Sequence, residues 1–501
     1  MTLRVAMPRS ADRCSMAVLA SVLSGAIVVG AATARAPLLV LVVALALGLG
    51  ALVVARPAWA AYLLTGLTPL LAGIDRGRLV PALRPNEALL LLCAAALCAR
   101  GIWNLRTGDR VRPRIGPIAA SLVLMAVCNS IVPLLWMALR DVPITDDDVS
   151  YAVVLWKYLA LYAVVRAGVR VASQVNRCLW ISIASASLVA GIAVLQALDL
   201  FGVEGFLDSF YAPFGDTSLV TNNRGSATLG LAAATADLML FNLALVAALW
   251  WRGAARLSLL APLGALFVAG TLASGQFSAA IGLVVVIIAL GLLFRRARLP
   301  VLLGLVTLAA AWPLQSVIAT RLSGFGRVSG LPESWVGRLE NLRNYFWPRL
   351  FSDYNFVLGV QPSARVPSPR TLALPWVWIE SGYTWLLWGG GLPLLASYIL
   401  FVALALRYGW RAGRRADLEG VVATGVLVAV LVVAVLMLFD PHLTYRGSGD
   451  LLFILLALAA ALEARRRDAS TDPRTATADL VVRPAGPPRL PHHEHDGRVQ
   501  R

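Results

Sequence analysis

Long apolar stretches recur along most of this chain, separated by short segments that carry arginines. Leu38–Ala55 and Val421–Phe439 are typical, because each is long enough for an α-helix to cross a bilayer. Taking apolar stretches of about 17 to 25 residues as spans, the pattern predicts about fourteen transmembrane helices. They are expected near 14–34, 37–55, 57–74, 86–105, 115–139, 150–168, 177–199, 225–250, 256–273, 276–294, 298–318, 379–406, 418–439 and 446–464. The expected fold is all-α, a polytopic membrane helix bundle.

The arginines support this number of spans and set their orientation. Short loops rich in Lys and Arg stay in the cytoplasm during membrane insertion. With the amino terminus inside, the predicted inner segments carry about three times as many arginines as the short outer loops. One outer loop also holds the acidic run Asp146–Asp148. The pattern predicts that both termini are cytoplasmic and that the first span is retained instead of being cleaved as a signal peptide.

Composition excludes two broad classes of protein. With 59% hydrophobic and 14% charged residues, the chain departs strongly from the composition of a soluble enzyme. Its 44 basic and 27 acidic residues give a net charge of +17, which would suit nucleic-acid binding if the basic residues formed one face. They lie instead in short blocks between apolar spans, so we expect no nucleic-acid partner.

Two segments interrupt the series of spans and define the expected domain organisation. Residues 1–318 hold the first eleven predicted helices, 319–378 form one large outer loop, and 379–464 hold the last three. The remainder, 465–501, is polar and rich in Pro and Arg, which is typical of a disordered cytoplasmic tail.

The large outer loop has the content expected of a functional segment. Long connections are uncommon and usually functional. Up to Pro375 it carries seven arginines and three acidic residues, either because long loops tolerate arginine or because the arginines meet an anionic substrate. Within it, Glu333–Leu350 has the apolar spacing of an amphipathic helix, and Arg338 lies on its apolar stripe. That guanidinium either extends to the aqueous surface or clamps a phosphate through its planar fork.

A second outer segment precedes the eighth span. Asp199–Asn223 is aromatic and acidic, like a segment that lies in the membrane interface. It leads to Arg224 at the mouth of the span, beside Gly225 and Ser226. An arginine that enters an apolar helix is costly unless it faces the bundle interior, so the position favours a functional role for Arg224.

Three segments, taken in order, resemble the O-antigen ligase and polymerase superfamily of bacterial polysaccharide assembly. The first is Asn222-Asn223-Arg224-Gly225-Ser226, and the second contains Arg321 and Arg338 and continues through Pro348 and Gly359. The third is Ile379-Glu380-Ser381-Gly382-Tyr383-Thr384-Trp385, which leads to Gly389-Gly390-Gly391. The resemblance covers roughly the second half of the chain and depends on the order of these loose motifs.

The resemblance implies an enzyme of the bacterial inner membrane that uses polyprenyl-diphosphate-linked glycans on its outer face. Arg224 and Arg338 fall where the family's diphosphate-binding arginines lie, and Arg321 and Arg446 are further candidates. In the ligase branch a histidine usually begins the motif after the large loop, whereas this chain has Glu380 there. The difference favours a polymerase of exopolysaccharide, capsule or O-antigen over a ligase that transfers glycan to a lipid acceptor.

The chemistry of such a transfer fits these residues. A diphosphate leaving group is already activated, so arginines can stabilise its growing charge without a metal ion, and we expect no cofactor. Glu380 could then be the base for the acceptor hydroxyl, although it could equally be an ion-pair partner of an arginine. Arg446 either completes the pocket or pairs with Asp450. The expected partners are a lipid-linked donor, a glycan acceptor, and a chain-length regulator or flippase.

The main alternative from another class is a flippase of lipid-linked oligosaccharides. Such transporters show internal repeats, short loops and charges deep within several helices. The chain has no evident repeat, and Lys157 and Asp237 are the exceptional deep charges, which neighbours could satisfy. The large outer loop therefore fits catalysis better than transport.

Overall fold

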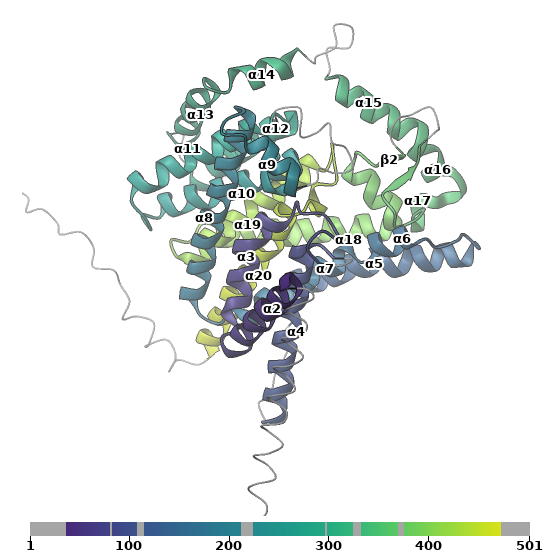
Figure 1. Cartoon of the computed structure of the whole chain (residues 1–501), viewed down its shortest axis with the longest axis horizontal. Coiled ribbons are helices and arrows are strands. Elements are labelled where there is room, and N and C mark those ends of the chain that lie inside the picture. Colours follow the sequence, from purple (N-terminus) through teal and green to yellow (C-terminus); the bar gives the residue numbers. More distant parts are fainter. Residues whose placement is uncertain are drawn as a thin grey trace, which may run out of the picture.

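The computed structural model describes residues 37–80, 83–107, 115–211, 224–295, 298–323, 332–368 and 375–471. These residues are mostly helical (Figure 1), and the expected all-α class is confirmed. The described strands, β1 (Arg365–Pro367) and β2 (Trp376–Trp378), form one short antiparallel pair within the large loop. The predicted first span, residues 222–223 and the chain from 472 onwards lie outside the described residues.

The predicted apolar stretches form helices close to their expected bounds. From the amino-terminal side these are α2 (Pro37–Ala55), α3 (Ala58–Leu71), α4 (Pro85–Arg106), α5 (Pro117–Leu139), α6 (Asp146–Ala152), α7 (Val154–Gly168), α8 (Ala172–Ala197), α9 (Val203–Phe210), η2 (Ala227–Leu229), α10 (Ala232–Trp251), α11 (Leu257–Ala273) and α12 (Phe277–Phe294). After the large loop come α18 (Gly382–Ala412), α19 (Leu418–Leu436), the 3-10 turn η5 (His442–Thr444) and α20 (Ser448–Thr471).

Among the described residues, eight helices are long and apolar enough to cross a membrane. They are α4, α5, the α6–α7 unit, α8, α10, α12, α18 and α19. Several shorter apolar helices, including α2, α3 and α11, accompany them. A multi-pass membrane protein is therefore supported, while fourteen spans and their orientation remain predictions.

The large loop departs from its expected boundaries at a proline. Instead of one span at 298–318, the chain forms α13 (Arg298–Ala311) and α14 (Gln315–Leu322). Pro313 lies between them and cannot supply the backbone N–H that a continuous helix needs. The predicted amphipathic helix is present as α15 (Glu333–Asn341), the π-turn η3 (Leu342–Phe346) and α16 (Trp347–Phe351), followed by η4 (Ser352–Tyr354) and α17 (Asn355–Leu358).

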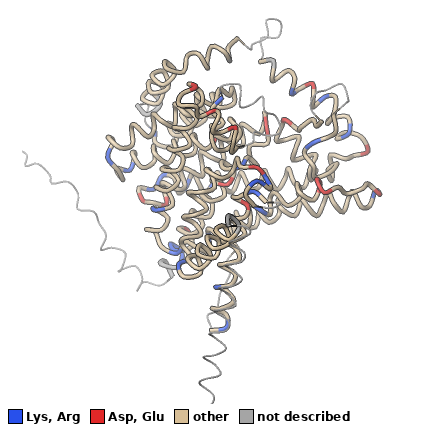
Figure 2. The backbone as a smooth tube through the Cα atoms, in the orientation of Figure 1, with Lys and Arg blue, Asp and Glu red and all other residues tan. Residues whose placement is uncertain are grey.

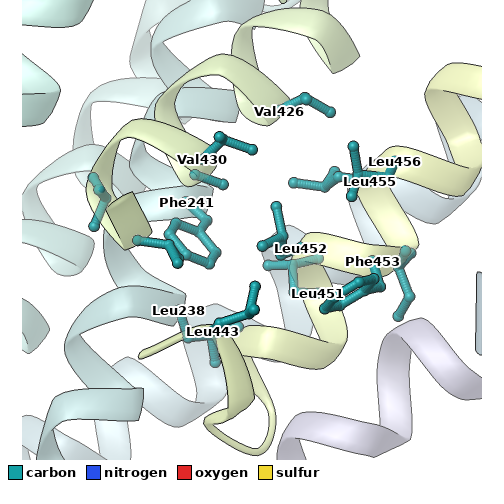
Figure 3. Packing of buried hydrophobic residues seen from close by; sticks show 14 of the residues in the cluster. Leu238, Phe241, Val426, Val430, Leu443, Leu451, Leu452, Phe453, Leu455 and Leu456 are labelled. Carbon is teal, nitrogen blue, oxygen red and sulfur yellow. The ribbon is translucent and has the colours of Figure 1, made fainter. Parts of the chain in front are cut away.

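Helix α10 lies at the centre of the bundle. Every residue in its membrane-length window is buried, whereas only 22% of the corresponding window of α4, which projects from the bundle in Figure 1, is buried. Small alanines along α10 let neighbouring helices approach closely. Figure 3 shows Leu238 and Phe241 of α10 beside Val430 of α19 and Leu452 of α20, all of them fully buried. This packing fixes the ends of α10, α19 and α20 relative to one another.

Contacts between connections follow the predicted sides. At the predicted outer end, the Gly73 amide donates to the Thr228 carbonyl at 2.9 Å, and the Gly225 amide donates to the Ala273 carbonyl at 2.9 Å. At the predicted inner end, Arg252 Nε donates to the Arg415 carbonyl at 2.8 Å. Each contact joins two segments that the arginine pattern assigned to the same side, so the predicted outer segments lie together.

Candidate functional site

Two of the predicted site residues meet at this outer end. Arg338 of α15 places Nε 3.5 Å from Glu380 Oε1. Its Nη1 lies 2.7 Å from Asp440 Oδ2 and donates to the Phe439 carbonyl at 3.1 Å. Asn341, one turn along α15, donates from Nδ2 to Glu380 Oε2 at 3.1 Å. We call Arg338, Asn341, Glu380, Asp440 and the adjoining Tyr445 the Arg338 cluster.

Backbone contacts hold the two carboxylates in place. Glu380 follows β2, and the Ile379 amide donates to the Ala364 carbonyl at 2.9 Å. Two residues later, the Gly382 amide donates at 2.8 Å to the Met437 carbonyl at the end of α19. A Cβ on Gly382 would lie 3.0 Å from the Asp440 carbonyl oxygen and 2.3 Å from Met437 Sδ, so a larger residue would force the neighbouring chain to shift. The start of α18 and the segment carrying Asp440 are therefore fixed together.

The glycines of the third motif anchor the large loop. Gly391 breaks α18 with a φ of +65°, and a Cβ there would lie 2.3 Å from the Val357 carbonyl oxygen. The Val360 amide donates to the Trp388 carbonyl at 2.7 Å. The loop thus packs directly on α18, which carries Glu380 at its start.

The mixture of charges in the Arg338 cluster shifts its pKa values. Burial raises the pKa of Glu380 above its usual range, Arg338 opposes this shift, and Asp440 adds to it. Burial alone would lower the pKa of Arg338, but Asp440 and Glu380 raise it instead. Arg338 is therefore held charged, while Glu380 is held closer to neutrality than an exposed glutamate.

A buried pair lies beside this cluster. His442 Nδ1 and Asp237 Oδ2 are 2.7 Å apart, and each side chain is 1% exposed. The His442 and Tyr445 rings have centroids 4.6 Å apart, and Asp440 is the charged group with the largest influence on the pKa of Tyr445. His442 Nε2 and Asp237 Oδ1 have no hydrogen-bond partner among the described residues. Asp237 thus finds the neighbour that a deep charge requires.

Arg446 faces a different group of charges. The strongest electrostatic influences on it are Arg84, which lowers its pKa together with burial, and Glu87. Arg84 lies 3.9 Å from Glu87, and Lys157 lies 3.5 Å from Asp450. We call Arg84, Glu87, Lys157, Arg446 and Asp450 the Arg446 cluster. Asp450, with which Arg446 was expected to pair if it does not complete the pocket, forms an ion pair with Lys157.

The remaining predicted site residues are Arg224 and Arg321. Arg224 precedes η2, and Gly225 holds this segment close, since a Cβ there would lie 2.8 Å from the Ala193 carbonyl oxygen. The Nε of Arg224 is buried without a hydrogen-bond partner. Within the described ranges, no ion pair joins Arg224 to Glu380. Arg321 lies in α14, and its side chain falls outside the described part.

The sequence does not reveal the contacts of Asn341 and Asp440 in the Arg338 cluster, or those of the neighbouring His442. Asn341 and Asp440 are ordinary polar residues beside predicted helix ends, and neither belongs to a motif. His442 was noticeable as the single histidine of the outer loops, but its pairing with Asp237 crosses 205 positions of sequence. Charged residues elsewhere gather in short groups between long uncharged stretches (Figure 2).

Comparison with protein-family models, with curated proteins and with solved structures finds no match for this chain. Among the described residues, no group of three His, Cys, Asp or Glu side chains is placed to hold a metal ion. The geometry of the Arg338 cluster therefore carries the functional argument.

Proposed function

We propose that this protein is a glycosyltransferase of the bacterial inner membrane that polymerises polyprenyl-diphosphate-linked oligosaccharide repeat units on the outer face. The observation that carries the proposal is the meeting of Arg338 with Glu380. These residues come from separate elements of the large loop and its exit, yet they lie 3.5 Å apart at the predicted outer end. A cation and a carboxylate of raised pKa are the two groups that such a transfer needs.

Arg338 is suited to binding the diphosphate. Asp440 and the Phe439 carbonyl fix its Nη1, so the guanidinium is oriented before substrate arrives. The side chain is 25% exposed, which leaves it within reach of a ligand. A planar guanidinium can donate two parallel hydrogen bonds to phosphate oxygens, a geometry that lysine cannot reproduce. The buried, unpartnered Nε of Arg224 would supply a further donor.

Glu380 is suited to accepting the proton. In the transfer, the acceptor hydroxyl oxygen forms a bond to the anomeric carbon of the donor, the bond from that carbon to the diphosphate breaks, and Glu380 takes the hydroxyl proton. The charge left on the polyprenyl diphosphate is stabilised by the arginines. Burial raises the pKa of Glu380, and a base is most effective when its pKa lies near the working pH.

Deleting the gene in its host tests the proposed function. Single repeat units accumulating on the lipid would support a polymerase. Complete chains left on the lipid would instead indicate a ligase, and repeat units trapped inside the cell would indicate a flippase; either result would overturn the proposal.

Replacing Arg338 by Lys in the restored gene tests the clamp. We expect a loss of about 100-fold in polymerisation rate, because one oriented donor to the leaving group is lost. Arg343→Lys is the matched control, since Arg343 is an exposed arginine of the adjoining turn. A wild-type polymerisation rate in the Arg338→Lys variant would refute the bidentate binding of phosphate by Arg338.

A further inference from the structure

Glu380 continues a strand face that carries two tryptophans. Along the segment from Trp376 to Glu380, the residues Trp376, Trp378 and Glu380 are partly exposed, whereas Val377 and Ile379 are buried. Successive side chains of an extended strand point to opposite faces. The two indoles therefore share a face with the carboxylate of the Arg338 cluster.

The neighbouring strand adds fixed polar groups to this face. Arg365 of β1 pairs in register with Trp378, and its guanidinium lies 4.4 Å from the ring centroid of Trp376 and 5.3 Å from that of Trp378. It donates to both oxygens of Asp147, from Nε at 2.9 Å and from Nη2 at 2.7 Å. Ser363 also donates to Asp147 Oδ2, at 2.6 Å.

We propose that Arg365, Asp147, Trp376 and Trp378 form a glycan subsite. It binds the sugars next to the glycosyl–diphosphate bond that breaks in the transfer. This inference rests on the proposed function and deepens it. Residues two apart on a strand are separated by about 7 Å, so Trp378 receives the sugar nearest Glu380 and Trp376 the next one outward.

The chemistry of the subsite matches a sugar. A pyranose ring has a face of C–H groups, which packs on an indole, and a rim of hydroxyls, which need donors and acceptors. Arg365 and Asp147 supply both kinds of group, and their side chains are 26% and 25% exposed. Their charges balance each other, so the subsite favours a neutral polar ligand over a phosphate or a lipid tail.

Binding of two probes to the full-length protein in lipid nanodiscs tests the subsite. One probe is sugar-free undecaprenyl diphosphate, and the other is the glycolipid extracted from the host strain that lacks the gene. We expect the double variant Trp376→Ala, Trp378→Ala to bind the glycolipid about tenfold more weakly than wild type. Its affinity for undecaprenyl diphosphate should be unchanged, which also shows that the variant is folded.

Two further variants make the result specific. Trp376→Tyr with Trp378→Tyr keeps aromatic faces and should restore most of the glycolipid affinity. Trp410→Ala removes a similar tryptophan–arginine stack, with Arg414 4.5 Å from the ring centroid, at the predicted inner end, and should change neither affinity. The subsite is refuted if the double alanine variant binds glycolipid like wild type, or if the alanine and tyrosine pairs are equally impaired.

The two proposals fail in distinguishable ways. If wild type binds neither probe, or if Arg338→Lys weakens neither, the proposed function is wrong. If Arg338→Lys weakens both probes while the tryptophan variants weaken none, the diphosphate site stands and the glycan subsite alone is overturned.

Discussion

Arg338 contacts the connection between α19 and α20, and Arg446 is part of it, but the charges around the two guanidinium groups have opposite effects on their pKa values. Arg338 contacts the carboxylates of Glu380 and Asp440, which raise its pKa. Arg446 is influenced most by burial and by Arg84, which lower its pKa. The side chains of Tyr445 and Arg446 divide between the two clusters although the residues are adjacent. Among charged groups, Asp440 has the largest influence on the pKa of Tyr445, and Arg84 has the largest influence on that of Arg446.

Arg338 and Arg446 are therefore suited to different roles, although the sequence predicts that both lie on the outer side. A guanidinium fixed by carboxylates is charged and oriented before a ligand arrives, which suits the binding of a transition state. A guanidinium beside a like charge is destabilised by that neighbour, and its cluster already satisfies most of its own charge through ion pairs. We therefore expect changes in the Arg338 cluster to affect catalysis far more than changes in the Arg446 cluster.

The largest effect is expected for Glu380→Gln, which removes the base but keeps the shape of the side chain. Loss of general-base catalysis should lower the polymerisation rate by about 10²- to 10⁴-fold. The measurement is polymer formed per unit time from extracted lipid-linked repeat units. Glu340→Gln, at an exposed position on α15, is the matched control and should retain full activity. Equal rates for Glu380→Gln and wild type would assign Glu380 a purely structural role.

A large loss of stability is expected for Asp237→Ala. The substitution leaves buried His442 without the partner of its Nδ1 and should cost about 1–3 kcal/mol of stability. Thermal unfolding of the protein in detergent measures this cost. Asp237→Asn keeps a hydrogen-bonding oxygen and should restore part of the stability. An unchanged melting temperature for the alanine variant would show that the pair does not support the connection shared by both clusters.

A smaller effect, on pH dependence, is expected for Asp440→Asn. A base must be ionised to accept a proton, so the activity of wild type should rise with pH through the pKa of Glu380. Asp440 raises that pKa, and its removal should move the acidic limb of the pH–rate profile to lower pH. Movement of this limb to higher pH, or no movement, would show that Asp440 does not tune Glu380.

The sequence predicted the helices well because apolar periodicity and length decide them locally. Most described spans begin and end within a few residues of their expected bounds. Three differ more: α10 begins at Ala232 instead of 225, α20 continues to Thr471 instead of ending at 464, and Pro313 divides 298–318 into two helices.

The contacts of the candidate site could be predicted only in part, because the residues that meet come from distant segments. The order of the motifs singles out Arg338 and Glu380, and these two side chains lie 3.5 Å apart. The position of Asp440 depends on how the end of α19 packs against Gly382. The surroundings of Arg446 depend on the direction of its own side chain just before α20. Neither packing event leaves a pattern in the sequence.

The smallest effect is expected for Arg446→Gln. This variant tests whether Arg338 and Arg446 have different roles. Removing Arg446 relieves its repulsion with Arg84, and Glu87 keeps Arg84 and Arg76 as partners. Polymerisation should therefore fall by less than about tenfold, because the Arg446 cluster contributes no group that the proposed transfer uses. If Arg446→Gln instead matched Arg338→Lys, both arginines would act on one diphosphate. A double variant would then identify a shared ligand, because residues that act as a unit give non-additive losses.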